Sequence, residues 1–232
     1  MQHCDTLIVP RWCVPAVPAG AVLEGHAVAV SEGRIDAILP LLEARTRYQP
    51  SALIERPDHV LIPGLVNAHT HAAMTLFRGL ADDLRLEAWL REHIWPAERR
   101  WVSPELVRDG AELAIAEMLR GGTTCFSDQY FFPEIVAQAA TDLSMRAVVA
   151  TPVADFKSSW AGNAAEYLQK ATDLVQLLRD STLSIWAISR VSRRYRNPRV
   201  RHRRPPDRFT IFTHIVLRWT MSCACPGGQI DS

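Results

Sequence analysis

The sequence predicts an α/β protein: a small β-sandwich module over residues 1–60, followed by the N-terminal half of a (β/α)8 barrel over residues 61–189. Short strand-like runs separated by tight turns fill the first sixty residues, whereas strand-like and helical runs alternate after them. Four alternating strands make half a barrel, because a complete one needs about 250 residues by itself. An aberrant arginine-rich tail over residues 190–232, expected to be disordered, completes the expected organisation.

The N-terminal module is expected to be β-structured and not helical. CDTLIV predicts one strand, and HAVAVSEGRIDAIL predicts a hairpin with Glu32 and Gly33 at its turn. ALIERPDHVLIP adds one or two strands, interrupted at Pro57, since proline cannot donate a hydrogen bond to a neighbouring strand.

The alternation of strands and helices begins at Val60. VLIPGLVNA is an almost continuous apolar run, typical of a parallel strand that is covered on both faces. SPELVRDGAELAIAEMLRGG predicts a helix that begins after Ser103 as its N-cap and ends at Gly121-Gly122. One face of this helix is expected in the core and carries Val107, Ala111, Ala114 and Met118.

Three further strands follow along the chain. TTCFSD is the second strand, a helix near Pro133 to Leu143 comes next, and RAVVATPV is the third strand. NAAEYLQKATDLVQLLRD predicts a helix with Asn163 as N-cap and Glu166 in a capping box. LSIWAIS is the fourth strand, and the alternation stops after Ser189.

The charge of the chain is divided unevenly. Residues 190–232 carry ten arginines and two acidic residues, a balance of +8, against −7 for residues 1–189. Arginine-rich, proline-rich and lysine-free sequence is typical of GC-rich codons read out of frame, so a shift of the reading frame near residue 189 is one hypothesis. The alternative is a basic arm that binds RNA or DNA. No regular aromatic residues accompany the arginines, so no nucleic-acid partner is expected.

Composition favours a soluble cytoplasmic protein. The hydrophobic content of 48% and the charged content of 22% are ordinary for a globular chain. The five cysteines have no disulfide-framework spacing, which favours a reducing compartment. The N-terminus lacks the features of a signal peptide, and no apolar run is long enough to span a bilayer, so no membrane association is expected.

The stretch PGLVNAHTH places His69 and His71 at the end of the first predicted barrel strand. Side chains two residues apart on a strand point to the same face, and barrel enzymes build their sites at the carboxyl ends of their strands. Neutral imidazole is a common zinc ligand. The residues alone leave two interpretations open, a metal site or a polar strand end that contacts water or backbone.

Three longer stretches carry a family resemblance. PGLVNAHTH resembles the first-strand signature of the amidohydrolase superfamily. AAMTLFRGLADDLRLEAWLREHIWPAE and GTTCFSDQYFF are similar to its 5-methylthioadenosine/S-adenosylhomocysteine deaminases, close to the chlorohydrolase-like deaminases. The resemblance covers roughly residues 5–189 and includes the N-terminal β module.

The resemblance implies a metal-dependent hydrolytic deaminase of a purine nucleoside, which converts the adenine amine to hypoxanthine plus ammonia. It implies one Zn2+ (or Fe2+) per active site, held by His69, His71, two later histidines and a late aspartate. Glu98 in IWPAE matches the substrate-binding glutamate, whose carboxylate can accept the ribose hydroxyl groups. Guanine, a triazine or another N-heterocycle stays open as the substrate.

Several neighbouring residues have two interpretations each. Phe77 and Trp95 either form walls of a purine site or belong to the core. Arg78, Asp82 and Asp83 either shape a loop over the site or form surface ion pairs. Asp128, at the end of the second barrel strand, is interpreted as structural.

The chain departs from the family pattern after the fourth strand. Arg190 and the residues after it stand where the family has a substrate-contacting histidine, and the later H-x-H-x-x-E-T segment is absent. His214 has no glutamate at the required spacing and is not assigned as a ligand. No catalytic residue is therefore assigned, and this chain by itself is expected to be inactive and poorly folded. A non-catalytic truncated product is the second functional class, and homo-oligomerisation stays open.

Overall fold

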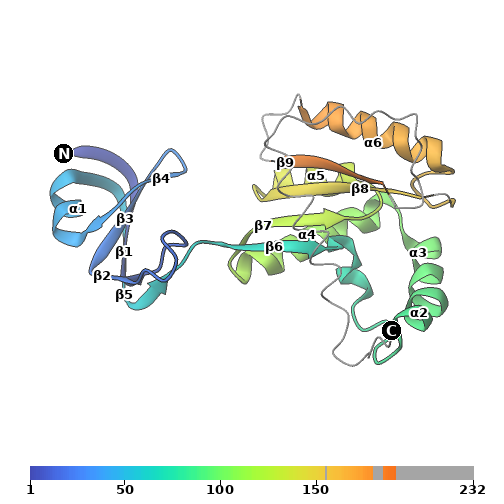
Figure 1. Cartoon of the computed structure of the whole chain (residues 1–232), viewed down its shortest axis with the longest axis horizontal. Coiled ribbons are helices and arrows are strands. Elements are labelled where there is room, and N and C mark those ends of the chain that lie inside the picture. Colours follow the sequence, from blue (N-terminus) through green and yellow to red (C-terminus); the bar gives the residue numbers. More distant parts are fainter. Residues whose placement is uncertain (155, 180–184, 192–232) are drawn as a thin grey trace, which may run out of the picture. The chain divides into compact units, whose positions relative to one another are not determined.

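The computed structural model describes residues 1–154, 156–179 and 185–191. Two compact units divide the chain, Met1–Gly64 (unit 1) and Leu65–Ser232 (unit 2), and both are drawn in Figure 1. The expectations for residues 192–232, which include most of the arginine-rich tail, lie outside the described residues.

The strands of unit 1 form one sheet, in which β1 pairs with three other strands. The second sheet of the expected β-sandwich is not found among the described residues of this unit. The order is β2-β1-β3-β4, and β5 pairs with β1 in parallel. Glu32 and Gly33 both have left-handed φ angles, 51° and 71°, as a tight hairpin turn requires. The predicted hairpin is therefore confirmed. The strands are β1 (Gln2–Cys13), β2 (Leu23–Glu24), β3 (His26–Ser31), β4 (Arg34–Pro40) and β5 (Tyr48–Leu61).

Unit 1 also contains one short helix that the sequence did not predict. Helix α1 (Leu41–Arg47) follows β4 directly, and its Ala44 is buried. Ala44 packs in a core cluster with Leu7 and Tyr48. A helix of seven residues is too short to show the periodicity by which helices are found in sequences, and tertiary packing stabilises it.

The apolar run over residues 60–68 is two strands and not one. Strand β5 ends at Leu61, and β6 (Leu65–Thr70) begins after the Pro63-Gly64 pair, in the other unit. Pro57 does not interrupt β5, because the pairing of β1 with β5 shifts register between Pro10 and Trp12. Such an irregularity accommodates a residue without an N–H donor.

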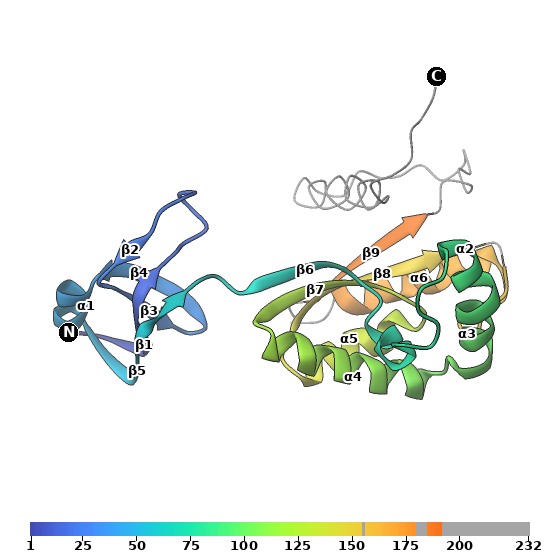
Figure 2. The ribbon, with the colours of Figure 1, turned by 90° about the horizontal axis from the view of Figure 1, so that it is seen from below.

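The described part of unit 2 contains a parallel sheet with helices packed on one face. The strands pair in the order β6-β7-β8-β9, and all three pairings are parallel. Figure 2 shows α4, α5 and α6 on the same side of this sheet. The elements after β6 are β7 (Thr123–Gln129), β8 (Arg146–Val153), β9 (Ile185–Val191), α4 (Pro104–Arg120), α5 (Pro133–Asp142) and α6 (Ala164–Arg179). The predicted strand and helix alternation is confirmed.

Two helix starts follow the predicted capping. The Ser103 hydroxyl accepts a hydrogen bond from the Leu106 N–H at 3.2 Å, so Ser103 is the N-cap of α4. Asn163 Oδ1 accepts from the N–H of Glu166 at 3.1 Å. The Glu166 carboxylate accepts from the N–H of Gly162 at 2.7 Å, one residue before the N-cap. The reciprocal pattern is thus a displaced form of the expected capping box.

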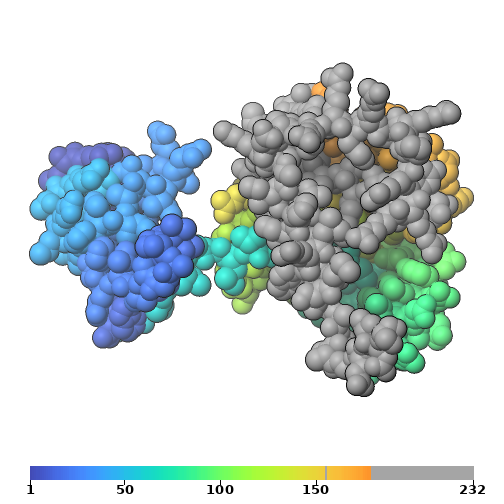
Figure 3. All heavy atoms as spheres, in the orientation of Figure 1, coloured from blue at the N-terminus to red at the C-terminus, as the bar shows by residue number. Residues whose placement is uncertain are grey.

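Strand β6 is not covered on both faces, contrary to the expectation. Leu65 is 51% exposed and Val66 is 60% exposed, and the start of β6, drawn in cyan, lies at the surface in Figure 3. Among the described strands, β6 pairs only with β7. An apolar run in a sequence predicts a buried strand, but it does not show on how many sides other elements cover that strand. The core lies instead between the sheet and its helices, where Val107, Ala111, Ala114, Phe126 and Val149 are buried.

Gly110 of α4 lies against the backbone of the 3-10 helix η1 (Ala72–Phe77). A Cβ atom at position 110 would lie 2.4 Å from the carbonyl oxygen and 2.9 Å from the Cα atom of Ala73. Backbone atoms cannot move aside as the end of a flexible side chain can. The close approach of α4 and η1 therefore depends on glycine at this position.

Gly110→Ala is expected to lower the free energy of unfolding by about 1–3 kcal/mol through overpacking, measured by urea unfolding. Gly121→Ala is the matched control, because a Cβ atom there would lie 3.4 Å from the Glu117 carbonyl oxygen and Gly121 has a negative φ angle. Equal stabilities of the two variants would contradict the role of Gly110.

Candidate metal and substrate site

The paired histidines lie at the carboxyl end of β6. His69 belongs to the strand and His71 follows it directly. Their rings meet edge to face, with 5.2 Å between the centroids. Strand β6 has one extra residue relative to β7, because Asn67 pairs with Phe126 and Thr70 pairs with Asp128. This irregularity has the form of a β-bulge, a feature that re-aims side chains beside active sites. The two histidines are thus neighbours, although the strand between them is not regular.

The ring of His71 is held by the backbone of β7. Its Nδ1 atom lies 2.5 Å from the carbonyl oxygen of Gln129. A carbonyl can only accept, so Nδ1 carries the hydrogen and Nε2 keeps its lone pair. Partial burial lowers the pKa of His71, and the neighbouring His69 lowers it further, while the bond to Gln129 opposes the shift. The neutral, ligand-competent imidazole is therefore favoured.

Asp128 holds the chain immediately after His71. Its carboxylate is 1% exposed, and Oδ1 accepts the N–H of Ala72 at 2.6 Å. Oδ2 has no hydrogen-bond partner in the part of the chain that the structure describes. Burial raises the pKa of Asp128 to about 7, and the bond from Ala72 limits the shift. The carboxylate fixes the first turn of η1, in line with the structural interpretation of this residue.

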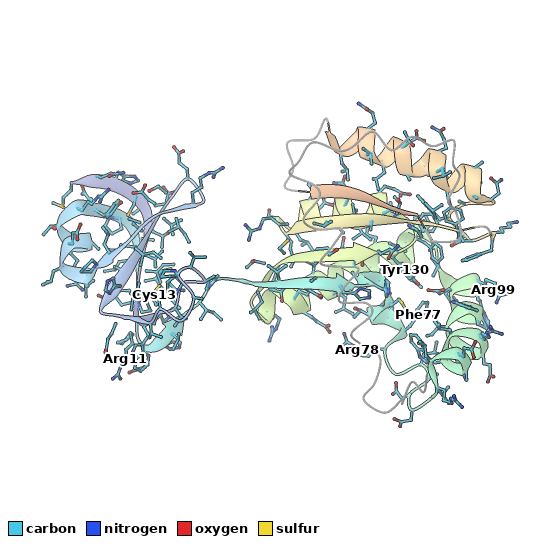
Figure 4. The ribbon with its side chains drawn as sticks, viewed as in Figure 1. Arg11, Cys13, Phe77, Arg78, Arg99 and Tyr130 are labelled. Atoms are coloured by element: carbon cyan, nitrogen blue, oxygen red, sulfur yellow. The ribbon has the colours of Figure 1, made fainter. Side chains whose placement is uncertain are left out.

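Glu98 reaches the same cluster from a helical segment. It lies on α3 (Trp95–Trp101), which continues α2 (Leu86–Ala88) and the π-helix η2 (Trp89–Ile94). The Tyr130 hydroxyl donates to Glu98 Oε1 at 2.8 Å. The Tyr130 ring is buried, and its centroid lies 6.2 Å from that of His71. Figure 4 shows Tyr130 between the strand ends and α3.

The electrostatics of this pair follow from its partial burial. Burial raises the pKa of Glu98, and the hydrogen bond from Tyr130 opposes that rise. Burial also raises the pKa of Tyr130, and the negative charge of Glu98 raises it further. The phenol is therefore a donor throughout the physiological pH range.

The other candidate residues are not drawn into the cluster. Phe77 packs against the core beneath the sheet, and Trp95 is 43% exposed. Arg78 forms a two-pronged ion pair with Glu117 of α4, at 3.0 and 2.6 Å. Figure 4 labels Phe77 and Arg78 beside η1. For Arg78 the ion-pair interpretation is the one that the structure supports.

Two residues of the cluster were missed in the sequence. Tyr130 follows β7 directly, and its position at the carboxyl end of a strand is a signal that could have identified it. Gln129 acts through its backbone carbonyl, so its residue type carries no such signal. Within residues 1–154, 156–179 and 185–191, no group of three or more His, Cys, Asp or Glu side chains could hold a metal ion.

The sequence matches the amidohydrolase family over residues 60–187, more than half of its length. The chain belongs to this family. The family resemblance predicted from the three sequence motifs is confirmed.

Curated relatives of this amidohydrolase chain are named 5-methylthioadenosine/S-adenosylhomocysteine deaminase. The protein of Saccharophagus degradans is 45% identical over 170 residues, which are 73% of this chain and 38% of the relative. That of Teredinibacter turnerae is 45% identical over 179 residues, 77% of this chain and 40% of the relative. The chain thus spans about two fifths of the length of the curated relatives it matches.

Solved structures of amidohydrolases have the same fold over most of the chain. An adenosine deaminase from Xanthomonas campestris with bound zinc is 49% identical and has a TM-score of 0.79, covering 81% of this chain and 43% of its own. Atrazine chlorohydrolase from Arthrobacter aurescens is 19% identical, has a TM-score of 0.68 and covers 79% of this chain and 46% of its own. At that identity it shows the fold alone. No helix among the described residues is long and apolar enough to cross a membrane.

The raised pKa of Asp128 predicts a pH-dependent stability. Between about pH 4 and pH 7 the unfolded chain loses this proton while the folded chain keeps it, so stability falls as the pH rises, by at most about 1.4 kcal/mol per pH unit. Asp128→Asn is expected to flatten this part of the profile, measured by urea unfolding with a metal chelator present.

Asp142→Asn is the contrasting variant. The Arg108 guanidinium lowers the pKa of Asp142, so its contribution to stability is lost only as the pH falls below about 4. Parallel profiles of the wild type and the Asp128→Asn variant between pH 4 and pH 7 would contradict the shift.

Proposed function

We propose that this chain carries the N-terminal part of a metal-dependent deaminase that hydrolyses the adenine amine of 5-methylthioadenosine or S-adenosylhomocysteine. The products are the hypoxanthine counterpart and ammonia. The observation that carries the proposal is the convergence of His69, His71 and Glu98 at the ends of β6 and β7, with Tyr130 between them. Relatives at 45% identity that are named as such deaminases support it.

His69 and His71 are the residues that would hold Zn2+ (or Fe2+), one ion per active site. The donor chemistry fits, because the bond of His71 to Gln129 leaves Nε2 with its lone pair and the His69 ring lies beside it. When bound, the ion supplies the acidity that makes water a nucleophile near neutral pH. The lowered pKa of His71 reduces competition from protons for the ligand atom.

Glu98 binds the substrate by accepting hydrogen bonds from the ribose hydroxyl groups. Its position on α3 directs the carboxylate toward the buried Tyr130 and leaves it half-buried. A partly desolvated carboxylate binds neutral hydroxyl donors more strongly than one in water. A ribosylated purine is therefore favoured over a free base or a triazine.

The domain organisation belongs to the same proposal. Residues 1–60 form a small β module, residues 61–189 form the N-terminal half of a (β/α)8 barrel, and residues 190–232 are read out of frame. Two histidines are fewer than the three protein ligands typical of catalytic zinc. This chain by itself therefore binds zinc and substrate weakly and does not catalyse the deamination. Genomic sequence across codon 189 tests the frame: an unaltered frame with no continuation nearby contradicts this part.

Zinc affinity tests the metal ligands. His71→Ala is expected to weaken zinc binding at least about tenfold, since even residues that only orient a ligand affect affinity by that much. Competition with a chromophoric chelator measures it. His26→Ala is the control, because the His26 ring contacts the Glu24 carbonyl in unit 1. The same affinity in both variants would exclude His71 as a ligand.

Calorimetric titration with 5-methylthioadenosine tests the substrate class. Glu98→Gln is expected to weaken binding about tenfold, because hydrogen bonds to a charged acceptor contribute about 1.5–3 kcal/mol. Glu87→Gln on α2 is the control, since the exposed Glu87 pairs only with Arg91 among the contacts described for it. No binding by the wild-type chain would contradict the proposed function. Ammonia release by the wild-type chain would support the substrate and refute the inactivity.

A further inference from the structure

We propose that Tyr130 is a positioning residue for Glu98: its hydroxyl group holds one carboxylate oxygen, so that the other faces the vicinal hydroxyl groups of the ligand. The inference rests on the proposed function, because it assumes that Glu98 contacts a ribose. Tyr130 would act through Glu98 and determine how strongly the hydroxyl groups of the ligand are bound.

The helical segment turns Glu98 inward. Ile94, Glu98 and Val102 follow each other at intervals of four residues, which places them on one side of the segment. Ile94 is 2% exposed and Val102 is 7% exposed, so this side is the packed one. The N–H of Val102 donates to the Glu98 carbonyl at 3.0 Å and continues the turn. Packing alone would favour an apolar side chain between two buried ones, and the carboxylate at this position needs another explanation.

Tyr130 contacts only one of the two oxygens of the Glu98 carboxylate in the described part of the chain. A buried phenol usually has a hydrogen-bond partner, and Tyr130 donates to Oε1 at 2.8 Å. Among the described residues, no hydrogen bond to Oε2 accompanies it. Because Tyr130 is only 5% exposed, its ring cannot follow a moving carboxylate. The rigid partner therefore selects one orientation of the Glu98 side chain.

The residues at the end of β7 contact both a histidine and the glutamate of the cluster. Gln129 holds the His71 ring through its carbonyl oxygen, and the next residue, Tyr130, holds Glu98. The metal-binding and substrate-binding side chains are thus fixed by consecutive residues but through different bonds. Loss of the Tyr130 hydroxyl should weaken ligand binding and leave zinc binding unchanged.

The expected size of the effect follows from side-chain freedom. Without its partner the Glu98 side chain samples several rotamers, and binding must select one of them, which costs about 0.5–1.5 kcal/mol for a rotamer-rich side chain. This corresponds to a loss of affinity of roughly 2–13-fold. Only a ligand whose hydroxyl groups contact Glu98 should lose affinity.

The experiment measures the dissociation constants of 5-methylthioadenosine and of its 2′,3′-dideoxy analogue by calorimetry, with the full chain. Tyr130→Phe is expected to weaken the ribose ligand roughly 2–13-fold and the dideoxy ligand less than about twofold, with zinc affinity unchanged. In a Glu98→Gln background the Tyr130 substitution is expected to add no further discrimination between the two ligands.

Two further variants complete the test. Tyr48→Phe removes a similar hydrogen bond, from a buried phenol to Asp36 in unit 1, and should change neither constant. Glu98→Asp keeps the charge but shortens the side chain by one methylene, so it cannot span the distance to Tyr130. It should show the selective loss with Tyr130 intact, as expected if the ribose contact depends on where the Glu98 carboxylate is held.

Equal losses for the two ligands, or none, in the Tyr130→Phe chain would overturn the positioning role and leave the proposed function standing. If the wild-type chain binds the ribose and dideoxy ligands equally, contact of Glu98 with the ribose is excluded and the inference fails with it. If the wild-type chain binds neither ligand, the proposed function itself fails.

Discussion

The site depends on the pairing of β6 with β7 at their carboxyl ends. Three consecutive residues at the end of β7 each fix a different part of the cluster: Asp128 accepts the N–H of Ala72, Gln129 accepts from His71, and Tyr130 donates to Glu98. Asp128 and Tyr130 act through their side chains, whereas Gln129 acts through its backbone carbonyl. The residues that the β6–β7 pairing places at the end of β7 therefore orient the His71 ring and the Glu98 carboxylate.

The packing of α4 against η1 is a second constraint on the residues that follow β6. Helix α4 contacts η1 closely because Gly110 has no side chain, and η1 begins directly after His71. The same helix holds Arg78 through Glu117 at the other end of η1. The turn that follows the histidines is thus fixed at its start by a buried carboxylate, in its middle by packing and at its end by an ion pair.

The elements of unit 2 could be predicted because hydrophobic periodicity and capping residues, such as Ser103 and Asn163, are local signals. Helix α1, the open side of β6 and the break at Pro63-Gly64 could not, since each depends on partners distant in the sequence or on very short segments. His69, His71 and Glu98 were predicted from motifs. The bonds that orient them were missed because a carbonyl such as that of Gln129 is present at every residue.

The side of β6 that faces away from β7 has no partner strand among the described residues, which has a consequence for the behaviour of the chain in solution. Leu65 and Val66 are exposed on a strand that has a single partner among the described ones. A row of free N–H and C=O groups beside apolar side chains is a template for the backbone of another molecule. Self-association through added strands, which can progress to aggregation, is therefore favoured as the concentration of the chain rises.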